Sequence, residues 1–333
     1  MPSDAPSTAR SEELILAFLA EAGDAFTSGE AISNKLGLSR TAVWKNVESL
    51  RHKGYVIEAL PAKGYRLTEI PDRLTELELE PLLSTHDFGR TLHHHAELAS
   101  TNDLAHRLAL EGALHGETVV AEHQTAGRGR RGRTWVSPPG KNLYLSVVLR
   151  PELPPQRAPE LTFVAAVAVA EALGDANVPA RIKWPNDVEV GGKKLAGILT
   201  ELHAEPDRVS AVILGIGVNL NLAAEDLPAE LRSTATSARI VRGEPVPRAL
   251  FAAALLGKLE QWYDRHAEQG FEPICDRWRE LTSTLDREVR VRTGGRELVG
   301  RAQDVDESGA LLVAVGDSLE RVVAGDVEML RAT

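Results

Sequence analysis

The chain has 333 residues, a formal net charge of -10 at pH 7 and a hydrophobic content of 43%. Its length is typical of about two domains, and its apolar content suffices for buried cores. The negative charge excludes general affinity for nucleic acids or membranes, so a contact with DNA requires a locally basic element. The single cysteine, Cys275, excludes an internal disulfide framework and a multi-cysteine metal site, and we expect a buried thiol without a chemical role.

The N-terminal residues and the apolar runs indicate where in the cell the protein is expected. The first ten residues are polar and rich in Pro and Ser, unlike a secretory signal, and no apolar run is long enough to span a bilayer. The longest candidate, residues 161–173, is rich in Ala and Val and predicts a buried helix. We therefore expect a cytoplasmic protein that makes no membrane contact.

The first 67 residues have the pattern of a winged helix-turn-helix. An apolar stripe at Leu14, Ile15 and Phe18 predicts a first helix, and residues 29–36 predict a short second one. A third helix is expected after Ser39, because serine is a favoured N-cap, and it ends near residue 53. Short strands over 55–58 and 65–67, joined through Pro61 and Gly64, then form the wing.

The third helix carries the locally basic character that DNA binding needs. Residues 33–53 contain five Lys or Arg and one Glu. That balance favours a recognition helix that enters the major groove and contacts phosphates through its basic side chains. A protein-interaction or dimerisation module is the alternative. The predicted DNA-binding residues are Ser39, Arg40, Thr41, Trp44, Lys45 and Arg51.

After an acidic segment, 68–90, the chain enters a long region with an α/β pattern. Ser100-Thr101-Asn102-Asp103 stands ahead of apolar positions 104 and 108, which predicts the start of a helix. A capping box, with Ser100 at the cap and Asp103 three residues later, could be its whole purpose. The alternative is that the hydroxyl, amide and backbone groups at this helix start bind a small polar ligand.

Residues 127–133 read Gly-Arg-Gly-Arg-Arg-Gly-Arg, which places four arginines and three glycines in an otherwise acidic chain. Glycine lets the backbone approach a ligand closely, and guanidinium groups bind phosphate or carboxylate through paired hydrogen bonds. Because four like charges repel one another, we expect the free loop to be mobile and to become ordered when an anion binds. A solvated basic loop or a nucleic-acid patch is the alternative.

Gly127, Gly129 and Gly132 also match the dinucleotide-binding pattern G-x-G-x-x-G, after a predicted strand over 118–124. In that motif the glycines open a helix whose N-terminus faces a pyrophosphate. Here the next residues contain Ser-Pro-Pro-Gly and lead to a predicted strand over 142–150. We therefore reject the dinucleotide-binding interpretation.

Three further motifs follow in the same region. Residues 183–187 read Lys-Trp-Pro-Asn-Asp, and residues 194–199 read Lys-Leu-Ala-Gly-Ile-Leu on a predicted strand. A later predicted strand ends in Gly-Ile-Gly-Val-Asn at 215–219, where the glycines permit close approach of a ligand. Beyond them, short alternating runs predict a small all-β domain, at 288–292, 297–304, 311–315 and 321–323.

These motifs, in this order and spacing, resemble those of the bacterial biotin protein ligases, specifically the bifunctional kind that also represses biotin synthesis. The resemblance extends from the winged helix to the C-terminal strands. Ala99 departs from it, because many relatives carry a polar or acidic residue there, and this bears on the detail of the ligand pocket. The implied fold is α/β and multi-domain, with a winged helix-turn-helix (1–67), a ligase domain with a mixed sheet (68–284) and a small SH3-like β-barrel (285–333).

The resemblance implies two activities. The first is an ATP-dependent ligase that forms biotinyl-5′-AMP from biotin and MgATP, and then transfers biotin to a lysine of a biotin carboxyl carrier protein. The second is a biotin-responsive repressor that binds operator DNA as a homodimer. ATP and Mg²⁺ are thus the implied cofactors, and biotin is the substrate.

The resemblance also implies roles for single residues. Lys194, Arg128, Arg130 and Asp187 are the expected catalytic residues, with Lys194 placed between the biotin carboxylate and the α-phosphate. Asp187 is also the best carboxylate for Mg²⁺, and a salt bridge is the alternative role for it. The expected biotin-binding residues are Ser100, Thr101, Asn102, Gln124, Gly127, Arg128, Arg130, Lys194 and Gly197. The expected ATP-binding residues are Arg130, Arg131, Arg133, Trp135, Lys183, Asn186 and Asn219.

Two rival functions share parts of this pattern. A lipoate or octanoate ligase could share the α/β fold, and a transcription factor could keep the pocket only to sense a metabolite. A pure sensor has no need of Lys194 or of the arginine loop, and a cysteine-based transferase is disfavoured because Cys275 lies far from every motif.

The run of three histidines at 93–95 is not expected to bind metal, since alternate residues of a strand share a face and no further ligand stands at a fixed spacing. Trp262 and Trp278 are expected in the core.

Overall fold

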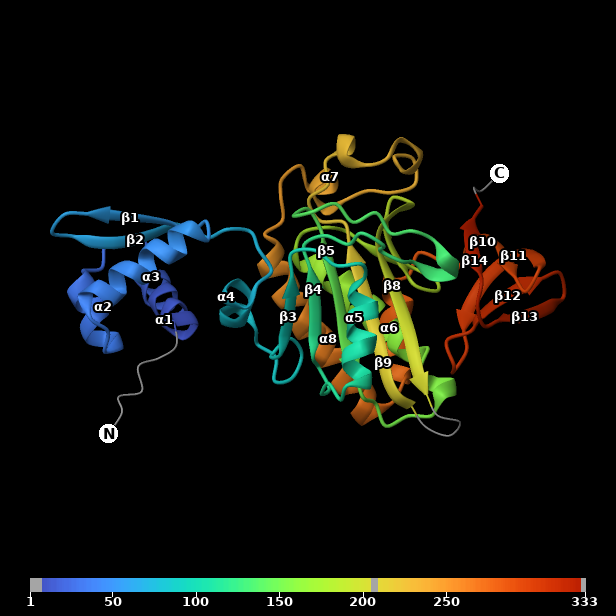
Figure 1. The fold of residues 1–333 in the computed structure, drawn as a ribbon. Coiled ribbons are helices and arrows are strands. Elements are labelled where there is room, and N and C mark those ends of the chain that lie inside the picture. The colour runs from blue at the N-terminus through green and yellow to red at the C-terminus, as the bar shows by residue number, and fades with distance from the viewer. Residues whose placement is uncertain (1–7, 205–208, 331–333) are drawn as a thin grey trace. The chain divides into compact units, whose positions relative to one another are not determined.

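The structure is a computed structural model that describes residues 8–204 and 209–330. By its internal contacts the chain divides into two compact units, Met1–Arg73 and Leu74–Thr333. Figure 1 shows the elements of each. None of the helices in the described ranges is both long enough and apolar enough to cross a membrane.

The first unit is the predicted winged helix-turn-helix. Its elements are the helices α1 (Thr8–Glu21), α2 (Gly29–Leu36) and α3 (Arg40–His52), and the antiparallel strands β1 (Val56–Leu60) and β2 (Gly64–Glu69) (Figure 1). Ser39 caps α3 by accepting a hydrogen bond from the N–H of Ala42. The stripe predicted for α1 is wrong in one position, because Leu14 is exposed while Leu16 and Leu19 are buried beside Ile15.

The second unit is built on a mixed seven-stranded sheet in the order β3-β4-β5-β9-β8-β7-β6. The strands β3 and β4 run parallel, and the remaining neighbours run antiparallel. This confirms the predicted α/β region with a mixed sheet. The strands are β3 (Leu92–His95), β4 (Thr118–Ala121), β5 (Leu143–Leu149), β6 (Arg181–Lys183), β7 (Asp187–Val190), β8 (Lys193–Ala204) and β9 (Val209–Val218).

Helices cover both faces of this sheet (Figure 1). Because successive side chains of a strand point to opposite faces, Val119 packs with one helix and Val120 belongs to the core formed with the others. The helix on the first of these faces is α5 (Thr101–Leu110). The other helices of the unit are α4 (Glu76–Leu79), α6 (Glu160–Asp175), α7 (Ala238–Arg242), α8 (Arg248–Gln269) and α9 (Glu272–Leu281).

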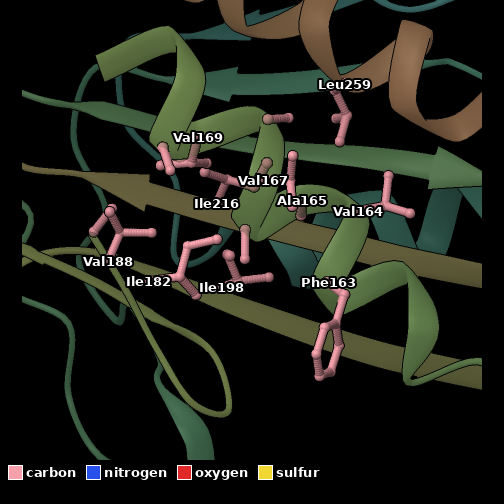
Figure 2. Close-up of a cluster of buried hydrophobic side chains, with 14 of the residues drawn as sticks. Phe163, Val164, Ala165, Val167, Val169, Ile182, Val188, Ile198, Ile216 and Leu259 are labelled. Carbon is pink, nitrogen blue, oxygen red and sulfur yellow. The ribbon is translucent and has the colours of Figure 1, made fainter. Parts of the chain in front are cut away.

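Helix α6 lies in the main core, which explains why it is apolar almost all round. Figure 2 shows Val164 and Val167 of this helix among side chains of the sheet, such as Ile198 and Ile216. The predicted buried helix is thus confirmed. The tryptophans expected in the core are also buried, at positions 262 and 278, and so is Cys275. Burial raises the pKa of the Cys275 thiol to about 12, so it stays protonated at neutral pH.

The C-terminal strands form a second, antiparallel sheet in the order β13-β12-β11-β10-β14. The strand-rich prediction is confirmed, but the last strand was not predicted. The two edge strands of this sheet do not pair with each other in the part of the chain that the structure describes, so the predicted closure into a barrel is not seen. The strands are β10 (Glu288–Thr293), β11 (Arg296–Val305), β12 (Leu311–Val315), β13 (Ser318–Val322) and β14 (Asp326–Met329).

A partly buried ion pair of the second unit contacts the first residue of that unit. Glu122, which directly follows β4, lies 2.6 Å from the guanidinium of Arg248 at the first position of α8. The same carboxylate accepts a hydrogen bond of 3.1 Å from the N–H of Leu74. Burial raises the pKa of Glu122, but attraction by His94 and Arg248 and the bond from Leu74 outweigh it and hold the pKa at about 2. The carboxylate therefore fastens Leu74 to the end of β4.

Candidate active site

Two neighbouring pockets lie between the sheet and the arginine loop, residues 127–133. The first is lined by the start of α5, by Gln124 and by strands β8 and β9. The second is a cavity of about 400 Å³ between the loop, strands β6 and β7, and the segment 222–235. The residues that line both pockets are Gly129, Arg130, Trp135, Asn186 and Lys194.

The first pocket contains the polar cluster predicted at the start of α5. Ser100 occupies the N-cap position, but its side chain makes no capping hydrogen bond. Asp103 does not complete a capping box either, because its carboxylate pairs with Arg128. The N–H of Thr101 donates instead to Gln124 Oε1 at 2.8 Å. The capping-box interpretation is therefore wrong for this segment, and its polar groups are turned toward the pocket.

Glycines form the wall of the site on β8 and β9. A Cβ at Gly217 would lie 2.7 Å from the indole of Trp135, and one at Gly197 would lie 3.1 Å from it. The ring can approach the sheet this closely because neither position has a side chain. The indole N–H of Trp135 is buried and has no hydrogen-bond acceptor among the described residues. An unsatisfied buried donor at a pocket wall favours a ligand with an acceptor atom there.

Lys194 stands where the two pockets meet. It lies on β8, which pairs with β7 and so brings the amine within 2.6 Å of Asp187 Oδ1. The amine also lies 5.4 Å from the centroid of the Trp135 ring. The ion pair weighed for Asp187 in the sequence is thus present. The amine thus lies at the junction of the pockets with Asp187 as its ionic partner.

The second pocket contains the predicted residues Lys183, Asn186 and Asn219, and also residues that the sequence did not reveal. The segment from Leu222 to Ala235 supplies several of these, and no motif marks them in the sequence. Backbone hydrogen bonds hold this segment to Lys194, from its N–H to Thr234 O at 2.8 Å and from Thr236 N–H to its carbonyl at 2.9 Å. The apolar members are Leu222, Leu227, Leu231 and Ala235.

The glycine pattern of the arginine loop opens no α-helix. A single 3-10 turn, Arg130–Gly132, is followed by extended chain that leads to β5. This confirms the rejection of a dinucleotide-binding motif. The expected biotin-binding residue Gly127 lines neither pocket. A Cβ there would lie 2.6 Å from the carbonyl oxygen of Trp135, so glycine permits close packing at this position.

Two arginines of the loop face the pockets. Arg128 lines the first pocket and pairs with Asp103 and, at 3.2 Å, with Glu201 of β8. Arg130 lines both pockets and donates from Nη1 to Asn186 Oδ1 at 3.0 Å. Burial and the nearby charge of Arg131 lower the pKa of Arg130. A partly desolvated guanidinium of this kind is stabilised by an anion in the pocket.

The other two arginines of the loop are held by the C-terminal sheet. Arg131 and Arg133 donate to the same carboxylate oxygen of Asp326, at 2.9 Å and 2.7 Å. Arg131 adopts a left-handed conformation with φ 56°, which is uncommon for a residue with a side chain. Arg131 lines neither pocket, whereas Arg133 and Asp326 line the second. Asp326 was not predicted, because it lies on the strand that the sequence did not reveal.

The predicted DNA-binding residues divide into two groups. Arg40, Thr41, Trp44 and Lys45 are exposed on one side of α3, and the indole of Trp44 is 53% exposed. Ser39 and Arg51 serve the fold of the unit. Ser39 is the N-cap of α3, and the guanidinium of Arg51 donates to the carbonyl of Ile57 at 2.9 Å and pairs with Glu48 at 2.6 Å.

The histidine run at the edge of the sheet is engaged in protein contacts. His93 lies 2.9 Å from Glu117 on the neighbouring chain segment. Within the described ranges, the group whose side chains converge closely enough for a metal is His86, Asp87 and Glu260. Both carboxylate oxygens of Glu260 already accept hydrogen bonds from the N–H groups of residues 86–88. That carboxylate therefore supports a turn.

The architecture defines a class, namely a helix-turn-helix unit joined to an α/β unit whose two pockets meet at a lysine beneath an arginine loop. The HTH domain family matches residues 12–66, the biotin/lipoate A/B protein ligase family matches residues 96–219, and the biotin protein ligase C terminal domain matches residues 284–330.

Relatives match most of the chain. The bifunctional ligase/repressor BirA of Bacillus subtilis (strain 168) is 42% identical over 316 residues, which cover 95% of this chain and 97% of the relative. The protein of the same description from Escherichia coli (strain K12) is 32% identical and covers 92% and 94%. The structure of biotin protein ligase from Aquifex aeolicus in complex with biotin and ATP superposes with a TM-score of 0.64 at 27% identity, over 73% of this chain and 100% of that one. This chain belongs to the biotin protein ligase family and, within it, to the bifunctional ligase/repressors.

Proposed function

We propose that this chain is an ATP-dependent biotin protein ligase and a biotin-responsive repressor. The observation that carries the ligase proposal is the position of Lys194. Its amine lines both pockets, so a carboxylate bound in one and a phosphate bound in the other would meet beside it. Relatives described as ligases, and one solved with biotin and ATP, support the choice of substrates.

The first half-reaction brings two anions together. An oxygen of the biotin carboxylate attacks the α-phosphorus of ATP, the bond to the β-phosphate breaks, and pyrophosphate leaves. Lys194 and Arg130 supply fixed positive charge where these anions meet, and fixed charge costs no reorganisation during the reaction. In the second half-reaction a lysine amine of the carrier protein attacks the acyl carbon of biotinyl-AMP, and AMP leaves.

We assign biotin to the first pocket and the adenylate to the second. Ser100, Thr101 and Gln124 offer hydroxyl, backbone and amide groups that suit the ureido ring of biotin. The leucines of segment 222–235 offer an apolar surface for the adenine, beside Asn219 and Lys183. A pocket that is apolar with a few placed polar groups is typical of nucleotide sites.

Asp187 is the protein group that would hold Mg²⁺. Magnesium is commonly bound by one or two carboxylates together with substrate phosphates, and this carboxylate lines the second pocket. When bound, the ion would neutralise charge on the phosphates. Asp187 pairs with Lys194 at 2.6 Å, so it also orients the amine.

The repressor activity rests on the first unit. The exposed residues Arg40, Thr41, Trp44 and Lys45 form the surface of α3 that we assign to operator DNA. A single winged helix contacts one half-site, so useful affinity requires two copies at a fixed spacing. We therefore propose a homodimer that binds an inverted-repeat operator, with biotinyl-AMP as the corepressor.

Further parts of the proposal concern organisation and location. We propose three functional domains, 1–67, 68–284 and 285–333, the last an SH3-like module. The family matches at 12–66 and 284–330 support the first and last of these. We also propose a cytoplasmic location, because ATP, carrier protein and operator DNA would all be met there.

Pyrophosphate exchange into ATP tests the ligase proposal. We expect exchange that depends on biotin and is absent with lipoate. Exchange that depends on lipoate instead would identify a lipoate ligase. No exchange with either acid, together with ligand-dependent DNA binding, would identify a transcription factor that only senses a metabolite.

A further inference from the structure

Glu201 of β8 contacts two residues that line the first pocket, Asn102 and Arg128. It follows Gly197 and Leu199 at alternate positions, so the three side-chain positions share one face of the strand. Glu201 Oε2 accepts a hydrogen bond of 2.8 Å from Asn102 Nδ2, and Glu201 Oε1 lies 3.2 Å from Nη1 of Arg128. One carboxylate thus joins the start of α5 to the arginine loop.

The amide of Asn102 is held at both ends. Its Oδ1 accepts from the hydroxyl of Ser146 at 2.6 Å, and its Nδ2 is bound by Glu201. Asn102 is 4% exposed and Ser146 is fully buried. A Cβ at Gly215 would lie 2.1 Å from Asn102 Oδ1, so the amide fills space that only glycine leaves open. Buried polar groups with all partners present are fixed in one orientation.

The same set of contacts continues to the other end of the loop. Ser146 Oγ lies 2.7 Å from Thr101 Oγ1, and Thr101 N–H donates to Gln124. Gln124 Nε2 then donates to Ser137 Oγ at 3.1 Å, and that hydroxyl donates to the carbonyl of Trp135 at 3.0 Å. A continuous polar network therefore runs from Arg128 through the first pocket to Trp135. These two residues are the ends of the segment 128–135, which borders the site.

We propose that Glu201 is a positioning residue that couples the biotin pocket to the closure of the arginine loop. It acts through two separable contacts. The hydrogen bond from Asn102 requires an acceptor atom on residue 201 and fixes the position of Asn102 in the first pocket. The contact with Arg128 requires a negative charge on residue 201 and holds the arginine loop. This inference rests on the proposed function, because it assigns the first pocket to biotin.

Two substitutions separate the contacts in the full-length chain. Glu201→Ala removes both, so we expect the Kd for biotin to rise about tenfold and biotinyl-AMP to dissociate about tenfold faster, the scale of losing a hydrogen bond to a charged group. Glu201→Gln keeps an acceptor for Asn102 but lacks the charge. We expect its Kd for biotin to stay within about threefold of wild type while biotinyl-AMP dissociates as fast as from the alanine variant.

The measurements are biotin titration and the dissociation rate of biotinyl-AMP, with Glu111→Ala, an exposed carboxylate beyond α5, as the matched control. Thermal unfolding checks that each variant is folded, and the glutamine variant preserves side-chain volume. Wild-type values in both variants would overturn the proposal, and so would equal loss of biotin affinity in both. Failure of the proposed function is distinct, since wild type itself would then lack biotin-dependent pyrophosphate exchange.

Discussion

At the scale of single residues, the proposed chemistry depends on one amine at the junction of two pockets. Lys194 is held by Asp187 and by the close approach of Trp135, which two glycines permit. In the proposed reaction, a cation placed this way would meet the charge that develops as the carboxylate reaches the phosphate. Arg130, which lines the same two pockets, adds a second positive group.

Replacing Lys194 with Ala should lower the rate of adenylate formation by about a hundred- to a thousandfold, the scale of losing one donor to a transition state. The assay is biotin-dependent pyrophosphate exchange. Lys193→Ala is the matched control, because that neighbouring side chain is exposed and contacts the carbonyl of Arg232. Exchange within a factor of two of wild type in the Lys194 variant would remove this lysine from the mechanism.

At the scale of elements, the arginine loop is tied to the C-terminal sheet through Asp326. Two guanidinium groups share this carboxylate, and one of them belongs to Arg131 in its left-handed conformation. Conformations of this kind persist where surrounding contacts hold them. The contact therefore gives the C-terminal sheet a part in shaping the second pocket, which Asp326 also lines.

Asp326→Asn should let the loop open more readily, so we expect biotinyl-AMP to dissociate about two- to tenfold faster, since exposed ion pairs each contribute less than about 1 kcal/mol. Glu328→Gln is the control, because it lies on the same strand and pairs with Arg290 away from the loop. The dissociation rate of biotinyl-AMP is measured by stopped flow in both variants. Equal rates in the two variants would show that the sheet does not hold the loop.

The elements also show what the sequence could and could not predict. The winged helix and the place of the five motifs on helices, strands and turns were predictable, because short local patterns specify these elements. Asp326, Glu201 and the segment 222–235 were not, since they reach the pockets only through pairing of strands and loops far apart in the chain. The contact of Arg51 with Ile57 was not predictable either, because it forms only when the strand after α3 folds back beside the helix.

At the scale of the whole molecule, the free energy of unfolding should fall at acid pH through the partly buried carboxylate of Glu122. The folded state holds the pKa of Glu122 at about 2, below its ordinary value of 4.5. A carboxylate whose pKa is lower in the folded than in the unfolded state stabilises the fold at pH values above its unfolded-state pKa. This contribution is lost as the pH falls from about 4.5 toward 2. The difference between these two pKa values corresponds to about 3 kcal/mol in the free energy of unfolding.

Glu122→Gln should therefore destabilise the protein by about 3 kcal/mol at pH 7, because Arg248 loses its buried partner, and should differ less from wild type at pH 3. Urea unfolding at both pH values measures this difference. Glu111→Gln, an exposed change, should follow wild type throughout. A constant difference between pH 7 and pH 3 would contradict the assignment of this acid sensitivity to Glu122.

The two proposed activities should be linked through their shared intermediate. If biotinyl-AMP strengthens operator binding by some factor, operator DNA must strengthen the binding of biotinyl-AMP by the same factor. We expect both effects, together with dimerisation promoted by the intermediate. Gel-shift and sedimentation titrations with and without biotinyl-AMP measure them. Identical operator affinity in the two conditions would leave a ligase whose DNA-binding unit does not respond to its product.

The bond from Leu74 to Glu122 has a consequence for how such proteins evolve. The first residue of the second unit is fastened inside that unit, to the end of the strand that leads to Gln124. We therefore expect the second unit to fold without the residues that precede this joint. A gene rearrangement that removed, exchanged or lengthened the preceding segment would leave the catalytic pockets intact. Regulation could then be gained or lost in a lineage by a single recombination event, without any change in the chemistry.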